Sequence, residues 1–79
     1  MNETYLRMIA EKVLSEEGQF AISKLLAQGR IGEAKVRVLE GVNSRYWDWD
    51  ISFEDAAEFY ILLDVPSDNF PQRQNQAFF

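Results

Sequence analysis

The chain has 79 residues, of which 47% are hydrophobic and 14% aromatic, so we expect one small folded domain and not a disordered segment. Cysteine and histidine are absent, which excludes disulfides, thiolate nucleophiles, cysteine-based zinc sites and the usual general base near neutral pH. The formal net charge of −5 argues against direct binding to nucleic acid, because phosphates require a basic surface.

No apolar run approaches the roughly 18 to 20 residues needed to cross a bilayer. The N-terminal stretch MNETYLRMIAEK has acids among its apolar residues and lacks the basic region followed by an apolar region that marks a signal peptide. We therefore expect a cytoplasmic protein with no membrane partner and no cofactor.

Two short helices are expected at the start of the chain. Residues 3–14 show helical spacing of apolar positions, with charges of alternating sign on the other side. The break near SEEGQ leaves two boundaries open: either Gly18 ends the first helix, or Ser15 caps a second helix whose first turn carries two acids. Gly29 is well placed as the residue after the second helix. The apolar positions of the two helices are Leu6, Ile9, Ala10, Val13, Leu14, Phe20, Ile22, Leu25 and Leu26.

The segment from 34 to 42 fits either a helix or a strand. A helix would gather apolar residues three or four positions apart on one side, whereas a strand would alternate apolar residues with Lys35 and Arg37. The string LAQGRIGEA resembles the turn between the two helices of a tetratricopeptide repeat, although the residues expected in that repeat's first helix are not matched. The residues that carry this resemblance are Gly29, Ile31, Glu33 and Ala34, and those of the helical stripe are Ile31, Ala34, Val38 and Val42.

The stretch RYWDWDISFED favours the strand. Its apolar residues, beginning with Trp47 and Trp49, alternate with polar ones at a period of two, which puts both tryptophans on one face. A turn at 43–44 would pair Trp49 with Val38 and would bring opposite charges together on the other face. The sequence therefore predicts a β-hairpin over residues 35–51.

A last helix is expected in SFEDAAEFYILLDVP, with Ser52 as its N-cap, Asp55 three residues later and Pro66 as its stop. The sequence beyond it is rich in Gln, Asn and Pro and predicts a flexible tail. The predicted fold class is α+β: a single small domain over residues 1–66, ordered α-α-β-hairpin-α, followed by a flexible tail at 67–79. The alternative is an all-α fold of four short helices.

The acids near the second tryptophan predict neither a metal site nor an enzyme. DWDISFED resembles the start of an EF-hand calcium loop, but its sixth and twelfth positions hold Phe53 and Phe59 in place of glycine and glutamate. Asp48 and Asp50 would project from one face of the strand, where neighbouring acids are usually just solvated. Because the chain has no glycine-rich phosphate loop and no nucleophile motif, we expect no enzyme and no bound metal.

The expected function is that of a small acidic protein-interaction module, an adaptor or inhibitor that occupies a partner protein through the hairpin edge or as a homodimer. In this arrangement Trp49 belongs to the core and Trp47 is partly exposed at the hairpin tip. The alternative is an acidic mimic of DNA that inhibits a nucleic-acid-binding protein. The residues expected to contact the partner are Arg45, Tyr46, Trp47, Asp48, Asp50, Phe78 and Phe79.

The C-terminal stretch QRQNQAFF resembles the short peptides that dock on DNA sliding clamps. Gln72 and the closing Phe78 and Phe79 match that pattern, and Asn75 stands where those peptides carry an aliphatic residue. The resemblance implies that the two closing phenylalanines bind a partner.

Overall fold

The computed structural model describes residues 3–70, and over this range the chain is all-α. Four α-helices are followed by one turn of 3-10 helix, and no strand occurs among these residues. The helices are α1 (Glu3–Val13), α2 (Glu16–Ala27), α3 (Ile31–Trp47) and α4 (Phe53–Leu62), and the 3-10 turn η1 spans Ser67–Asn69.

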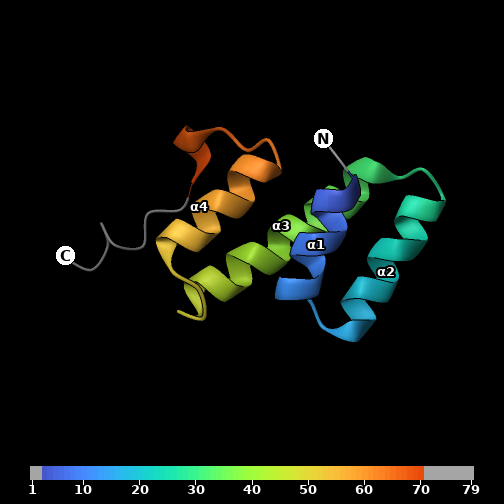
Figure 1. The fold of residues 1–79 in the computed structure, drawn as a ribbon, viewed down its shortest axis with the longest axis horizontal. Coiled ribbons are helices and arrows are strands. Elements are labelled where there is room, and N and C mark those ends of the chain that lie inside the picture. The colour runs from blue at the N-terminus through green and yellow to red at the C-terminus, as the bar shows by residue number, and fades with distance from the viewer. Residues whose placement is uncertain (1–2, 71–79) are drawn as a thin grey trace.

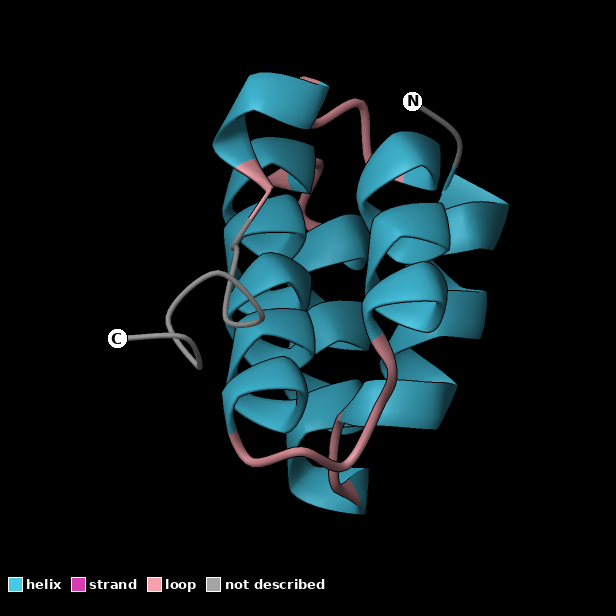
Figure 2. Cartoon of the chain, turned by 90° about the vertical axis from the view of Figure 1, so that its left-hand side faces the viewer, coloured by secondary structure: helices cyan, strands magenta, loops and turns pink. Residues whose placement is uncertain are grey.

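The longest helix, α3, is the centre of the arrangement. It packs against α1 and α2 on one side and against α4 on the other (Figure 1). Short loops join successive helices, so helices that follow one another in sequence lie side by side (Figure 2). Within the described part of the chain, no helix is both long and apolar enough to cross a membrane.

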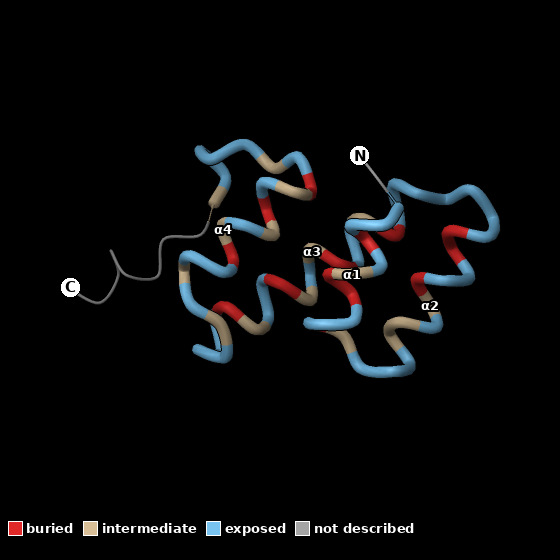
Figure 3. The backbone as a smooth tube through the Cα atoms, in the orientation of Figure 1, coloured by how far each residue is buried: buried red, intermediate tan, exposed pale blue. Residues whose placement is uncertain are grey.

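One apolar core holds the helices together. In α3 it consists of Ala34, Val38, Val42 and Tyr46, each four residues after the last and each 0% exposed. Figure 3 shows that buried segments alternate with exposed ones along each helix. The buried core residues are Leu6, Ile9, Ala10, Val13, Ile22, Leu25, Leu26, Ala34, Val38, Val42, Tyr46, Ala56, Tyr60 and Leu63.

The predicted hairpin does not form, and the α+β fold class is wrong. Ile31–Trp47 is one continuous helix, as in the alternative all-α interpretation. The alternation of apolar and polar residues starts at the end of α3, passes through a turn and stops at Phe53, the first residue of α4. Because each turn residue has its own φ and ψ, a period of two across a turn carries no information about a strand.

Two helix starts confirm the capping predicted from the sequence. The Ser15 hydroxyl accepts a hydrogen bond from the Gly18 N–H at 3.2 Å, so α2 begins after Ser15 and the open boundary is resolved. The Ser52 hydroxyl accepts one from the Asp55 N–H at 3.1 Å and starts α4 in the same way. Each serine satisfies a backbone donor for which the helix itself offers no acceptor.

The first residues of the segment predicted to be a tail contact the helices. The turn η1 packs against α4, and the ring centroid of Phe70 lies 5.2 Å from that of Tyr60. Residues 71–79, which include the stretch that resembles clamp-binding peptides, lie outside the described residues. The domain boundary at residue 66 therefore stays a prediction.

Candidate interaction surface at the turn between α3 and α4

Both tryptophans lie at the surface, one at the end of α3 and one in the turn that follows. Trp47 is 42% exposed and Trp49 is 65% exposed. The prediction that Trp49 belongs to the core is therefore wrong, whereas the partial exposure expected of Trp47 is confirmed. Exposed tryptophans are typical of protein-binding surfaces, because the ring offers a large apolar area and loses few rotatable bonds on binding.

A Schellman motif ends α3 and holds Trp49 in the left-handed conformation. The Trp49 N–H donates to the Tyr46 carbonyl at 3.1 Å, and the Asp50 N–H donates to the Arg45 carbonyl at 2.9 Å. This pattern of hydrogen bonds gives Trp49 a φ of 65°. Left-handed backbone costs an L-residue roughly 1 to 2 kcal/mol, which is why glycine usually occupies this position.

The ends of α2 and α4 show which residues this position ordinarily takes. The left-handed residue after α2 is Gly29, with φ 74°, as the sequence predicted, and the one after α4 is Asp64, with φ 62°. Glycine has no Cβ to clash, and aspartate is among the few other residues that tolerate the conformation. A tryptophan at the same position is unusual, and sparsely populated backbone geometry of this kind concentrates at functional sites.

Tyr46 and Arg45, which the sequence placed on the partner-binding side, contact the fold instead. Tyr46 is fully buried, with its ring centroid 5.3 Å from that of Trp47 and 6.3 Å from that of Phe53. Arg45 is half-buried, and its Nε donates to the Val13 carbonyl at 3.2 Å, at the end of α1. The two residues therefore hold the end of α3 in place beneath the turn.

Asp48 and Asp50 are exposed beside the tryptophans and belong to an acidic half of the chain. Between residues 46 and 72 the sequence has seven acids and no lysine or arginine, whereas residues 1–45 contain six acids and seven bases. Within residues 3–70, no three acidic side chains gather in an arrangement that could hold a metal ion. The turn and α4 therefore present a negatively charged surface that lacks the geometry of a metal site.

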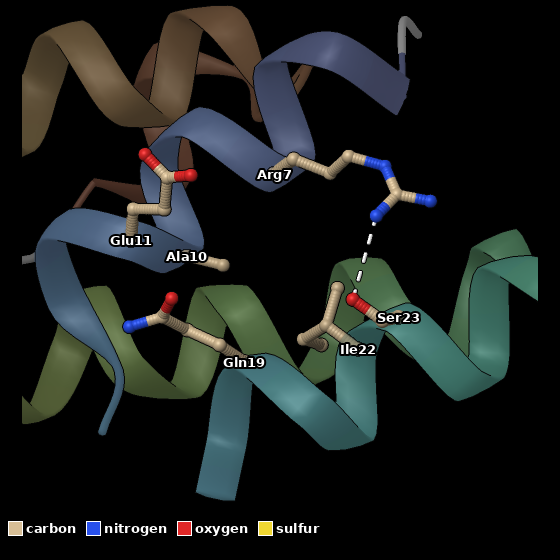
Figure 4. Close-up of a pocket in the computed structure, with 6 residues that line it drawn as sticks. All are labelled: Arg7, Ala10, Glu11, Gln19, Ile22 and Ser23. Carbon is tan, nitrogen blue, oxygen red and sulfur yellow. Dashed lines mark hydrogen bonds between the residues drawn. The ribbon is translucent and has the colours of Figure 1, made fainter. Parts of the chain in front are cut away.

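A hollow between α1 and α2 is too small to be a ligand site. Arg7 Nη1 donates to Ser23 Oγ at 3.4 Å and so connects the two helices. The volume of about 90 Å³ is well below the roughly 300 to 1,000 Å³ of small-molecule pockets. The residues around the hollow are Arg7, Ala10, Glu11, Gln19, Ile22 and Ser23 (Figure 4).

Tyr60 joins α4 to α3 through a buried phenol. Its hydroxyl donates a hydrogen bond to Asn43 Oδ1, and the residue is 3% exposed. Burial, and to a smaller extent the nearby Tyr46 phenol, raises the pKa of Tyr60 from its ordinary 10.0 to about 12. The folded state therefore holds the neutral form of Tyr60.

We expect the free energy of unfolding to fall as the pH rises from about 10 to about 12. The unfolded chain releases the Tyr60 proton at the ordinary pKa while the folded chain retains it, so this stabilisation is complete below pH 10 and lost across the window. Urea denaturation at several pH values measures the slope. Tyr60→Phe should show a shallower slope, and an identical slope in both proteins would show that Tyr60 titrates alike in the folded and unfolded chain.

Comparisons with known proteins leave the function to be inferred from the residues themselves. No protein-family profile, curated protein or solved structure matches the chain. Of the residues expected to contact a partner, the structure brings Trp47, Asp48 and Asp50 together at one exposed turn, while Phe78 and Phe79 lie outside the described residues. Sequence reasoning did not include Trp49 in this set, because the predicted hairpin placed it opposite Val38 and beside Ile51 in an apolar neighbourhood.

Proposed function

We propose that this chain is a small acidic protein-interaction module, an adaptor or inhibitor without catalytic activity that works in the cytoplasm by occupying a partner protein. The proposed contact surface is residues 47–50, here called the tryptophan turn. The observation that carries the proposal is Trp49, which is 65% exposed at a position where the backbone favours glycine. The Trp49 side chain is mostly exposed, and its left-handed backbone costs free energy. We therefore attribute the tryptophan at this position to binding of a partner.

The tryptophan turn has the composition and the rigidity of a binding hot spot. Tryptophan is among the residue types most enriched in hot spots, and here two of them flank an exposed aspartate. The buried ring of Tyr46 packs beside Trp47, and two backbone hydrogen bonds fix the conformation at Trp49. A surface ordered in this way loses less conformational entropy on binding than a flexible loop does.

Trp49→Gly should separate binding from folding. Glycine suits the left-handed position, so we expect the free energy of unfolding to rise by up to about 1 kcal/mol. Removing a hot-spot aromatic should weaken partner binding by about 2 kcal/mol, or about 30-fold in the dissociation constant. Partners are captured from an extract of the source cells on the immobilised wild-type chain, identified by mass spectrometry, and titrated by calorimetry against both proteins.

Phe20→Ala is the matched control, because Phe20 lies on α2 and is also 65% exposed. It should retain the partner. Equal losses of partner affinity in Trp49→Gly and Phe20→Ala would mean that capture reflects non-specific binding to exposed apolar side chains. Unchanged affinity in Trp49→Gly would exclude the tryptophan turn as the contact surface. If the partner is a second copy of the chain, sedimentation equilibrium should show dimers in the wild type and monomers in Trp49→Gly.

An acidic mimic of DNA is the second candidate function, favoured by the seven acids without a base between residues 46 and 72. Such a mimic would bind a basic protein through many exposed charges, so its affinity would fall steeply with ionic strength. Contact through the tryptophan turn depends mainly on apolar area and predicts a shallow dependence. Measuring the dissociation constant of the recovered complex at several salt concentrations distinguishes the two functions.

A further inference from the structure

A groove between α1 and α4 includes none of residues 47–50 of the tryptophan turn, although its lining residue Ile51 directly follows that turn. Both helices pack against α3, and where they face one another they leave an open groove of about 340 Å³. One wall is the part of α4 from residue 55 to residue 62, which covers two helical turns, about 11 Å. The apolar lining of the groove consists of Met8, Val13, Ile51, Phe59 and Leu62, all half-buried except Val13, which is buried.

The two rims of the groove carry opposite charges. Asp55 and Glu58 are exposed along the α4 rim. Lys12 stands on the α1 rim, with its ammonium group 6.0 Å from the centre of the Phe59 ring. Because residues 46 to 72 include no lysine or arginine, the acidic rim has no basic neighbour close in the sequence to neutralise it.

We infer that this groove binds an amphipathic α-helix of another protein, with apolar anchors at positions i, i+3 or i+4 and i+7 and with lysine or arginine on the flank that meets Asp55 and Glu58. The α4 wall is two helical turns long, which is the distance that anchors at i, i+3 or i+4 and i+7 cover along a helix. The acidic rim favours a basic flank and sets the orientation of the bound helix, since like charges placed there would repel.

The bound helix would pack against α1 and α4 as a fifth helix of the bundle. Four of the apolar lining residues keep part of their surface in water in the free protein, and a helix laid along the groove would remove that surface from water. The inference concerns a surface different from the tryptophan turn and does not depend on the function proposed for that turn.

Two designed peptides of about 15 residues test this inference. Both carry leucines at the anchor positions; one has lysines on the flank and the other has glutamates. Titration calorimetry should show the lysine peptide binding at least about tenfold more tightly, and amide shifts in NMR spectra should concentrate at Met8, Phe59 and Leu62. Glu58→Lys should abolish or reverse this preference. Glu58 is exposed on α4, and lysine is about as good a helix former as glutamate, so the fold should be retained.

Glu40→Lys is the matched control, because it makes the same charge change at an exposed position of α3 outside the groove. It should keep the preference for the lysine peptide. Three results would overturn the inference: equal loss of preference in Glu40→Lys and Glu58→Lys, shifts centred on the tryptophan turn, or no binding of either peptide. Trp49→Gly should leave the peptide affinity unchanged. The proposal for the groove and the proposal for the tryptophan turn can therefore be refuted independently.

Discussion

Tyr46→Ala should remove most of the stability of this domain. Tyr46 is 0% exposed, is among the largest fully buried side chains, and its ring contacts those of Trp47 and Phe53. Truncating a buried aromatic of this size costs about 3 to 5 kcal/mol, and small domains have only about 5 to 15 kcal/mol in total. Urea and thermal unfolding followed by far-ultraviolet circular dichroism measure the loss.

Trp49→Ala is the control for this experiment, because it removes a larger ring from the neighbouring turn. Trp49 is 65% exposed, and alanine keeps the left-handed strain, so we expect a change within about 0.5 kcal/mol. A larger loss in Trp49→Ala than in Tyr46→Ala would contradict the structure and would support the hairpin predicted from the sequence.

Gly41→Val should lower the free energy of unfolding by about 1 to 3 kcal/mol, because α1 and α3 approach each other closely at Gly41. A Cβ at this position would lie 2.6 Å from Leu14 Cδ2 and 3.2 Å from Val13 Cγ2. Leu14 can rotate away from a single methyl group, but the branched side chain of valine also meets Val13, which is 4% exposed and held in the core. Chemical denaturation of the variant and the wild type gives the difference.

Gly32→Val on the same helix provides the comparison. Apart from the adjacent residues and the backbone of α3 itself, no atom lies within 4 Å of a Cβ built there, so the substitution should change only helix propensity and should be neutral or slightly stabilising. Equal destabilisation at Gly32 and Gly41 would indicate that valine disturbs α3 itself, and the close approach of α1 to α3 would then not be the cause.

Helices α1, α2 and α4 were predictable because their signals are local. Apolar residues recur at three- and four-residue spacing, Ser15 and Ser52 supply the capping hydroxyls, and Gly29 supplies the left-handed residue after α2. Each signal operates within a few residues of chain, so it does not depend on how the helices pack.

The structure of α3 was mispredicted because two periods overlap in its sequence. Ala34 and Val38 fit both a helix and a strand, and Tyr46 extends the helical stripe by one more turn. Tyr46 also stands inside a run of alternating aromatic and acidic residues, which covers the end of α3 and the Schellman turn after it and no strand. The groove was not predictable, because it depends on the packing of α1 and α4, which are far apart in the sequence.

The placement of both tryptophans outside the core determines what the intrinsic fluorescence of this protein reports. Trp47 and Trp49 are already 42% and 65% in contact with solvent in the folded state, whereas the fully buried aromatic of α3 is Tyr46. Tryptophan emission should therefore lie near the wavelength of solvated indole before unfolding and change little during it. The same emission should shift to shorter wavelength, and become shielded from soluble quenchers, when another surface covers the two rings.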